Sequence, residues 1–312
     1  MEHTCQVGGH AHDTYLVIAL NIYGQLVQIV QKWVVIECRD PTSPFAVSAI
    51  PEQASFYCVP TFRTVPLVAI QLESDGETVI DYVIYSSTDG FLPRDCADVQ
   101  ESGRNVSGRY AIYPDDCQDP FFVYCDMDTD RGGWTIFHRR LDGGEDFDRG
   151  WADYKYGFGS VVNEHWLGNE RVYRIARQKL YQLRVDLEDF DGERRHAEYL
   201  TFRLGGEHQN YVIKLGPYSG DAGNGLLSHN KRPFTTKDRD NDGHDGNCAQ
   251  TYHGGWWYFS CHTVSLNGIF LAGPHDFGSQ GVVWSPWRGQ NYSLKRAEMK
   301  LRPLSARARF ND

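Results

Sequence analysis

The sequence predicts an α+β fold, and three features of the 312-residue chain support this class. Leu183–Leu187 alternates apolar and polar residues as a half-buried strand does, and Phe202–Leu204 and Tyr211–Leu215 fit two further strands. Arg171–Lys179 contains neither glycine nor proline and predicts a short helix. After about Leu226 the regular patterns give way to glycine, asparagine and aromatic residues, which predicts a long irregular part of the kind that carries function.

Residues 1–90 differ from the rest of the chain in charge. They hold ten acidic and three basic residues, whereas residues 91–312 hold 31 acidic and 28 basic residues. We expect this region to form either a small β-rich module or a partly disordered segment, with a strand at Val79–Tyr85 and a hairpin turn at Gly76. Ser86–Gly90 has the composition of a linker.

Composition narrows the classes of protein to consider. A formal net charge of −10 argues against nucleic-acid binding, which requires a basic surface. Hydrophobic residues make up 41% of the chain and aromatic residues 13%, enough for a packed core. Eight cysteines suit an oxidising compartment. Asn105 and Asn291 each begin an Asn-x-Ser tripeptide and are candidate glycosylation sites.

The first residues do not resemble a standard secretion signal. Met1–His12 contains no apolar run, and the apolar blocks in residues 15–36 are interrupted by Asn, Gln and Lys. Either the start belongs to a truncated or misassembled gene product, or the segment is an unusual signal-anchor. We favour the first interpretation and do not expect membrane anchoring.

The acidic run Lys237–Ala249 is the most informative stretch. It places four aspartates and two glycines within thirteen residues. Repulsion among these carboxylates favours a bound cation, and oxygen ligands on a turning backbone suit Ca²⁺. The run is not an EF-hand, because Ala249 stands where that loop needs a bidentate glutamate. A solvated acidic turn is the alternative.

A short cysteine loop follows the acidic run. Cys248 and Cys261 are thirteen residues apart and enclose Tyr252, Trp256 and Trp257, a spacing that favours a disulfide worth roughly 3 kcal/mol. Further motifs lie in order along the sequence: Asp95–Val99, Tyr124–Asp130, Gly132–Thr135, Phe137–Arg140, Gly157–Gly159, Trp166–Asn169, Leu266–Gly268, Asn291–Ser293 and Glu298–Pro303.

These motifs together resemble the fibrinogen-related domain, the family that includes the C-terminal parts of the fibrinogen chains, ficolins, tachylectins and angiopoietins. The resemblance covers about residues 92–304. It implies a fibrinogen C-terminal globular domain at 91–305, after an unassigned region 1–90 and before a tail 306–312. The implied architecture is a small subdomain pinned by a Cys96–Cys125 disulfide, a central mixed sheet with flanking helices, and an irregular calcium-binding lobe. For Cys117 we expect a bond to Cys58 or, as a rival, an intermolecular bond.

The resemblance also implies a calcium site and a ligand pocket. The side chains of Asp240 and Asp242 and the main-chain carbonyls of His244 and Gly246 would hold Ca²⁺. Asp238 and Asp245 would be outer or solvated charges.

The implied pocket lies beside the calcium loop. In the family the bond that matches Ser260–Cys261 is cis and turns backbone N–H groups towards the ligand. The residues carried over to the pocket are Tyr252, Ser260, Cys261, His262, Phe277 and Tyr292. Two positions depart from the acetyl-binding members, because Gly278 and Gln290 stand where those members have tyrosine.

We expect a calcium-dependent, extracellular, secreted recognition protein that is lectin-like and of the innate-immune type. Its ligands would be acetylated or other glycans on cell or microbial surfaces. The alternative is a protein-binding module of the angiopoietin or fibrinogen type, which recognises a receptor or a peptide. The sequence contains no collagen repeat and no sustained heptad, so an oligomer is left open but no stalk is expected. We do not expect an enzyme, because the common catalytic motifs are missing.

Overall fold

The computed structural model describes residues 92–116 and 118–304, together with four short strands nearer the N-terminus. The protein divides into two compact units, Met1–Leu92 and Pro93–Asp312. In the first unit, β1 (Val34–Glu37) pairs with β2 (Ala46–Ala49), and β3 (Leu72–Ser74) pairs with β4 (Thr78–Ile80), both antiparallel. The strand expected at Val79–Tyr85 overlaps β4. Cys5, Cys38, Cys58, Cys117 and the tail 306–312 lie outside the described residues.

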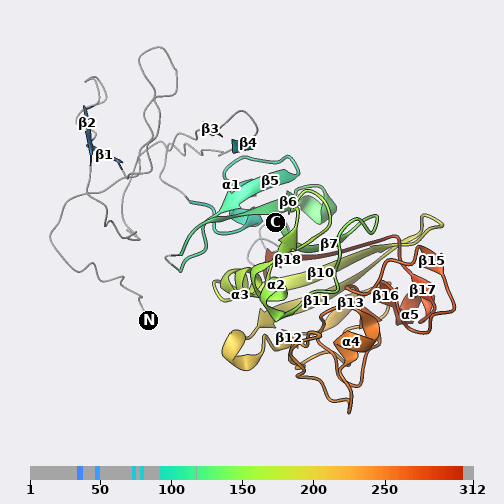
Figure 1. Ribbon diagram of the computed structural model, residues 1–312. Helices are drawn as coiled ribbons and strands as arrows, with labels where there is room; N and C mark the ends of the chain where they lie inside the picture. Colours follow the sequence, from blue (N-terminus) through green and yellow to red (C-terminus); the bar gives the residue numbers. More distant parts are fainter. Residues whose placement is uncertain are drawn as a thin grey trace. The chain divides into compact units, whose positions relative to one another are not determined.

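A large sheet forms the centre of the second unit, and its main path runs β12-β11-β10-β18-β7-β6-β5 (Figure 1). The pairings recorded between its strands are antiparallel. Its strands are β5 (Gly108–Ile112), β6 (Phe121–Asp126), β7 (Trp134–Arg140), β8 (Phe158–Gly159), β9 (His165–Trp166), β10 (Tyr181–Glu188), β11 (Arg194–Leu204), β12 (Ile213–Leu215), β13 (Tyr218–Gly220) and β18 (Arg296–Pro303).

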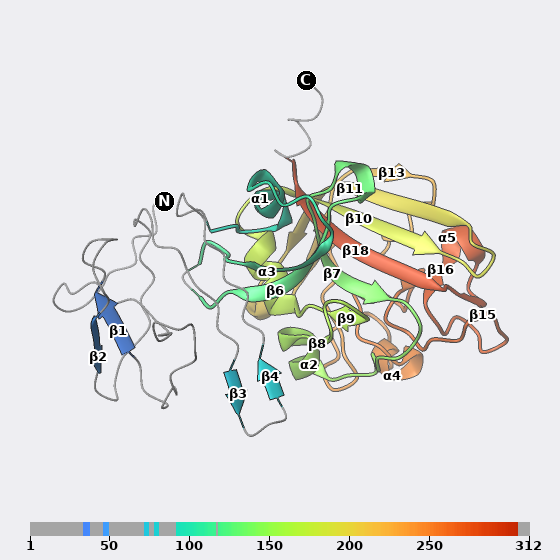
Figure 2. The same ribbon diagram turned by 90° about the horizontal axis from the view of Figure 1, so that it is seen from above.

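The helices are short. They are α1 (Cys96–Glu101), α2 (Trp151–Tyr156), α3 (Asn169–Ala176), α4 (Cys248–Tyr252) and α5 (Ser285–Arg288), with single 3₁₀ turns η1 (Thr129–Arg131) and η2 (Glu207–Gln209). A lobe that contains α4, α5 and the two-residue strands β14 (Val264–Ser265), β15 (Gly273–Pro274), β16 (Val283–Trp284) and β17 (Tyr292–Ser293) lies at the end of the sheet away from α1 and α3 (Figures 1 and 2). The predicted α+β class is confirmed.

Local chemistry explains the first elements. The Asp95 carboxylate caps α1 by accepting a hydrogen bond from the Asp98 N–H at 3.0 Å. The Cys96–Cys125 disulfide joins α1 to β6 across 29 residues, as predicted. The helix expected at Arg171–Lys179 is α3, which begins two residues earlier and ends at Ala176.

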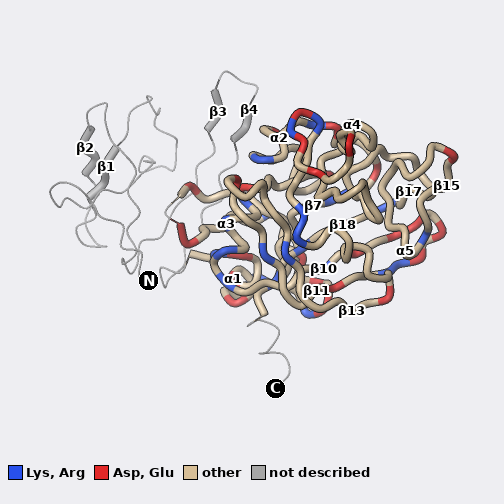
Figure 3. The backbone as a smooth tube through the Cα atoms, turned by 90° about the horizontal axis from the view of Figure 1, so that it is seen from below, with Lys and Arg blue, Asp and Glu red and all other residues tan. Residues whose placement is uncertain are grey.

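The sheet has one apolar face and one charged face. In β10, Leu183, Val185 and Leu187 are buried in the core. Arg184 and Asp186, which alternate with them, point to the other side of the sheet. The same alternation recurs in the first half of β11 and in β18. Figure 3 shows Lys, Arg, Asp and Glu interspersed along β10, β11 and β18. The face of the sheet away from the apolar core therefore carries a network of ion pairs.

Lys300 lies at the centre of this network of ion pairs. Its side chain is 2% exposed, and its ammonium lies 2.7 Å from Asp126, 2.6 Å from Asp186 and 3.1 Å from Glu298. Asp186 Oδ2 forms an ion pair with the Lys300 ammonium, but the two groups are not aligned as a hydrogen bond. Burial opposes ionisation of Asp126, but the Lys300 charge outweighs it and lowers the pKa of Asp126 to about 2. Burial likewise opposes the Lys300 charge, yet its three carboxylates raise the pKa of Lys300.

A second buried pair joins the sheet to the lobe. Arg140, at the end of β7, lies 3.5 Å from the Glu164 carboxylate, and both side chains are nearly fully buried. Arg140 also donates to the carbonyls of Leu266 at 2.9 Å and Gly268 at 2.8 Å. Glu164 accepts the backbone N–H groups of residues 141, 143 and 145. Both charges are thus compensated by the backbone around them.

We expect Lys300→Met to lower the free energy of unfolding by about 3–5 kcal/mol, because it removes the buried cation that three carboxylates share and leaves Asp126 without an ion-pair partner among the described residues. Urea unfolding at neutral pH measures this loss. The exposed Lys214, on β12, supplies the control Lys214→Met, which should change stability by no more than about 0.5 kcal/mol. The part of this deficit that comes from Asp126 should shrink as the pH falls from about 4 to about 2, because a lowered pKa stabilises the fold only while the carboxylate is ionised. Equal stability of the two variants would contradict the role of Lys300.

Candidate ligand-binding site in the C-terminal lobe

The lobe is built on a layer of buried aromatic residues. Trp256, Trp257 and Tyr258 are fully buried. The Trp257 indole N–H donates to the Tyr211 carbonyl at 2.8 Å, and the Tyr258 hydroxyl donates to the Gly254 carbonyl at 2.8 Å. These aromatic side chains therefore form the core of the lobe, and the polar atoms of Trp257 and Tyr258 hold its irregular backbone.

The Cys248–Cys261 disulfide closes the loop above this layer, as predicted. The amide oxygen of Asn247 caps α4 by accepting from the Gln250 N–H at 3.1 Å. The Ser260–Cys261 peptide bond is cis, which agrees with the expectation from the resemblance. The Phe259 carbonyl accepts the Gly243 N–H at 2.8 Å, so the acidic loop is hydrogen-bonded to the segment that carries the cis bond.

His262 and Tyr252 meet beside the cis bond. Their ring centroids lie 4.4 Å apart in an edge-to-face arrangement, and the Tyr258 ring lies 6.0 Å from His262. His262 is 8% exposed, and neither ring nitrogen has a well-aligned hydrogen-bond partner within the described residues, although the Ser279 backbone faces the ring. Burial lowers the pKa of His262 to about 4, so the ring is neutral at physiological pH.

A histidine that the sequence analysis did not identify fixes the strand after this pair. His229 is fully buried, and its Nδ1 lies 2.8 Å from the Trp257 carbonyl. Its Nε2 accepts the N–H groups of Thr263 at 3.3 Å and Val264 at 3.2 Å, which assigns the Nδ1–H tautomer. Burial lowers the pKa of His229 to about 3. No sequence signal distinguishes it from an exposed histidine.

The acidic loop separates into two kinds of aspartate. The Asp238 carboxylate accepts the Trp151 N–H at 2.8 Å and the Thr236 hydroxyl at 2.6 Å, so it holds α2 and the turn. Asp242 accepts the N–H groups of His244 at 2.9 Å and Cys248 at 3.0 Å. Burial raises the pKa of Asp242, and the charge of Asp240 adds to this rise. A cation between these two carboxylates would relieve both effects.

The donor set of this loop fits Ca²⁺ by its chemistry. It comprises the carboxylates of Asp240 and Asp242 and the carbonyls of His244 and Gly246, and these are hard oxygen ligands. Neither carbonyl accepts a hydrogen bond recorded for the described residues. Across that same part of the protein, no three His, Cys, Asp or Glu side chains gather into a metal-holding group. A cation here would therefore depend on main-chain oxygen and water as well as on two carboxylates.

Phe277 and Tyr292 lie differently from the pair just described. Phe277 is 67% exposed and stacks on His275 with ring centroids 6.2 Å apart. The Tyr292 hydroxyl accepts the Phe190 N–H at 3.0 Å. Between residues 118 and 304, no ring contact of either residue with Tyr252 or His262 is recorded. The structure thus brings together Tyr252, Ser260, Cys261 and His262, and it leaves the Phe277 ring on the surface.

Comparison with known proteins decides the family. Residues 92–304 match the family described as fibrinogen beta and gamma chains, C-terminal globular domain. The chain belongs to the fibrinogen C-terminal domain family. Fibrinogen C domain-containing protein 1 of Xenopus tropicalis is 48% identical over 219 residues, which cover 69% of this chain and 48% of that protein. The Homo sapiens protein of the same name is 48% identical over 214 residues, covering 67% and 46%. The chain spans about half the length of these curated relatives.

Solved structures have the same fibrinogen-like fold. The fibrinogen-like globe domain of human ANGPTL2 is 43% identical with a TM-score of 0.66, covering 68% of this chain and 99% of that one. Lamprey fibrin D-dimer, complexed with the peptide ligand Gly-His-Arg-Pro-amide, is 34% identical with a TM-score of 0.66, covering 69% and 75%.

Two further observations concern the surface of this fibrinogen-like domain. Asn105 and Asn291, the candidate glycosylation sites, are both exposed. None of the helices that the structure describes is long and apolar enough to cross a membrane.

We expect the His262 ring to remain neutral from about pH 8 to about pH 5.5, because burial disfavours its charged form. NMR of the ring C–H resonance measures this, and the His262→Ala variant assigns the signal. The unfolded protein would bind that proton near an ordinary pKa of about 6.5, so this group makes the free energy of unfolding fall as the pH drops below that value. A folded-state titration near 6.5 would contradict the buried placement.

Proposed function

We propose that the fibrinogen-like domain is a calcium-dependent extracellular recognition module, lectin-like, whose ligand binds beside Tyr252 and His262. The ligands are acetylated or other glycans on cell or microbial surfaces. The family, and the two disulfides that suit an oxidising compartment, support a secreted binding protein. Cys261 is bonded to Cys248 and is therefore not available as a thiol nucleophile.

The observation that carries the proposal is the state of His262. A nearly buried, neutral imidazole whose nitrogens lack good hydrogen-bond partners among the described residues can still donate to or accept from a ligand. The Tyr252 ring beside it supplies an apolar wall. A polar group next to an aromatic face suits a small neutral group with an oxygen and a methyl, as in an N-acetyl sugar.

Calcium has a supporting part in this proposal. When bound, the ion supplies positive charge and fixed coordination within the acidic loop. The protein transmits the order of that loop through two contacts: Asp242 accepts the Cys248 N–H, and Gly243 donates to Phe259. Both lead to the loop that presents Tyr252, the cis bond and His262, so loss of the ion is expected to loosen the ligand site.

Recognition of a protein or peptide is the second candidate. It is favoured by the exposed Phe277, which offers an apolar contact, and by the lamprey fibrin relative, whose structure holds a peptide. The stretch Ala249–Tyr252 contains no acidic residue, which disfavours a cationic peptide terminus as the ligand. A glycan array with and without a calcium chelator separates the candidates, because signals on N-acetyl sugars that chelation removes support only the first.

Asp240→Asn tests the calcium part. We expect wild-type protein at a calcium concentration about 100 times Kd to gain about 2.7 kcal/mol of stability, and the variant to lose most of this gain. Calorimetric titration and thermal melting measure both. Asp245→Asn, at an exposed position of the same loop, is the matched control and should retain the gain. Affinity should fall with falling pH, beginning above the usual aspartate range, because the pKa of Asp242 is raised. Identical wild-type melting with calcium and with chelator would refute the site.

His262→Ala tests the ligand site. We expect about a tenfold loss of affinity for N-acetylglucosamine or the best array ligand, equivalent to about 1.4 kcal/mol, with the domain still folded and still binding calcium. His208→Ala, at an exposed histidine on η2, is the control and should bind as the wild type does. Full binding by a folded His262→Ala variant would place the ligand elsewhere.

A further inference from the structure

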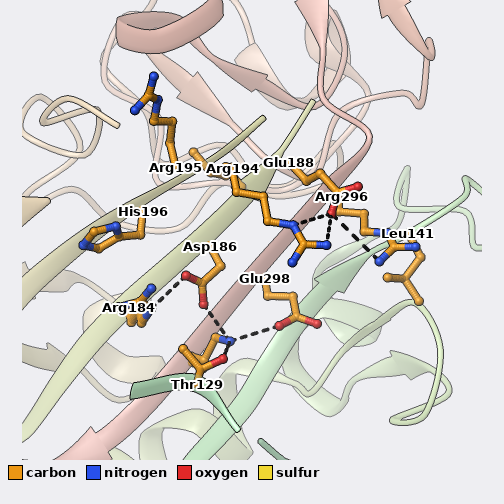
Figure 4. Close-up of a pocket in the computed structure, with 12 residues that line it drawn as sticks. Thr129, Leu141, Arg184, Asp186, Glu188, Arg194, Arg195, His196, Arg296 and Glu298 are labelled. Carbon is orange, nitrogen blue, oxygen red and sulfur yellow. Dashed lines mark hydrogen bonds and ion pairs between the residues drawn. The ribbon is translucent and has the colours of Figure 1, made fainter. Parts of the chain in front are cut away.

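A cleft of about 360 Å³ lies on the charged face of the sheet, over β10, β11 and β18 (Figure 4). Its lining residues come from these strands, from η1 and from the turn after β7, and none comes from the lobe with the Tyr252–His262 pair. Leu141 and Leu187 are the only apolar residues among those that line it. The other side chains are charged or polar, so the cleft is suited to a polar ligand.

The floor of the cleft has no surplus of positive charge. Lys300 is surrounded by carboxylates, of which Asp186 and Glu298 line the cleft. Arg184 is paired at 2.7 Å with both Asp186 and Glu198. Each cation of the floor therefore already faces two or more carboxylates, and an anion would gain little there.

At the end of the cleft formed by Glu188, cations outnumber carboxylates. This single carboxylate faces three cations: Arg194 at 3.0 Å, Lys295 at 3.0 Å and Arg296 at 4.0 Å. The Arg194 and Arg296 side chains are 75% and 50% exposed, and among the described residues the Arg296 guanidinium has an ion pair with Glu188 but no aligned hydrogen bond. Figure 4 shows both guanidinium groups directed at Glu188. These four side chains together carry an excess of two positive charges, and Arg194 and Arg296 are the two cations of the group that line the cleft.

The carboxylates next to this group are held by other cations. Asp189 and Asp191 share Arg288, on α5, which leaves them one negative charge in excess. Glu193 shares Arg195 with Asp221, at 3.7 and 3.4 Å. Burial opposes ionisation of Glu188, but the three cations outweigh it and lower the pKa of Glu188, so the carboxylate competes with any incoming anion without neutralising the group.

We propose that this cleft binds a sugar phosphate, with the phosphate monoester at the end where Arg194 and Arg296 line it. A phosphate monoester carries about −1.5 to −2 charges at neutral pH, which matches the two charges of these guanidinium groups, whereas a sulfate ester carries one. Guanidinium groups bind such oxyanions through paired N–H donors, and an exposed Arg296 has its donors available.

The rest of the cleft favours a sugar as the carrier of the phosphate. Beyond the cationic end, Asp186 and Glu298 present carboxylate oxygens and Thr129 presents a hydroxyl. These groups accept hydrogen bonds from hydroxyls, which a sugar supplies in number. A phosphopeptide would bring apolar and backbone groups to a surface with two leucines, so it is the less suitable ligand.

Calorimetric titration of the whole protein with glucose 6-phosphate, glucose 6-sulfate and inorganic phosphate tests the proposal. We expect saturable binding of the sugar phosphate, weaker binding of the other two, and equal affinity with calcium and with chelator. The ratio of phosphate to sulfate affinity should fall at least about threefold from about pH 8 to about pH 5.5, as the phosphate gains its second proton. His196 lines the cleft beside Asp221, and the sulfate ester, measured with the same protein, serves as the reference for this part of the cleft.

Matched variants locate the site. Arg194→Gln with Arg296→Gln should weaken glucose 6-phosphate binding at least about tenfold, and Arg203→Gln, at an exposed position of the same strand as Arg194, should leave it unchanged. Glu188→Gln removes the competing carboxylate and should strengthen binding. Failure of glucose 6-phosphate to bind at about 20 mM, far weaker than typical metabolite sites, would overturn the proposal. An equal loss in Arg203→Gln, or tighter binding of a phosphoserine peptide, would do so too. None of these outcomes bears on the calcium site, because the titrations are compared with and without the ion.

Discussion

The buried pair of Arg140 and Glu164 couples the sheet to the lobe that carries the candidate site. Buried charges are costly unless surrounding groups compensate them. Here the compensating groups are backbone N–H and C=O groups of turns, which lie outside the hydrogen bonding of the sheet. Glu164 collects N–H groups from the turn after β7, and Arg140 takes the carbonyls of Leu266 and Gly268 in the lobe. The irregular lobe thereby acquires a fixed attachment to the most regular part of the domain.

The sequence patterns located the strands in which buried and exposed residues alternate. The alternation at Leu183–Leu187 is the centre of β10, which lies beside β18 in the sheet. Phe202–Leu204 is the end of an eleven-residue strand, and the earlier buried positions of that strand, Ala197 and Tyr199, lie among charged residues. The strand expected from Tyr211 begins at Ile213, because Tyr211 has a left-handed φ of 49° and its hydroxyl donates to Glu170 instead. Periodicity reports burial, and it fails where a tertiary contact decides the backbone.

The site was predictable to a similar degree. The resemblance predicted both disulfides and the cis bond, and it placed Tyr252 and His262 in one pocket, where their rings are in contact. Motifs in the sequence carry these features. It could not supply His229, whose role depends on Trp257 and Val264 meeting across the lobe. The surplus of cations at Glu188 was equally invisible, since Lys295 and Arg296 lie more than a hundred residues along the chain from Glu188 and Arg194.

The ion pairs on the open face of the sheet differ in depth, and they will respond differently to ionic strength. At 1 M salt the screening length is about 3 Å, which weakens exposed pairs far more than buried ones. Arg194 and Arg296 are largely open to solvent, whereas Lys300 is shielded from it. Concentrated electrolyte should therefore release the outer guanidinium groups from Glu188 while the inner network holds, so that this surface becomes disorganised before the domain itself weakens.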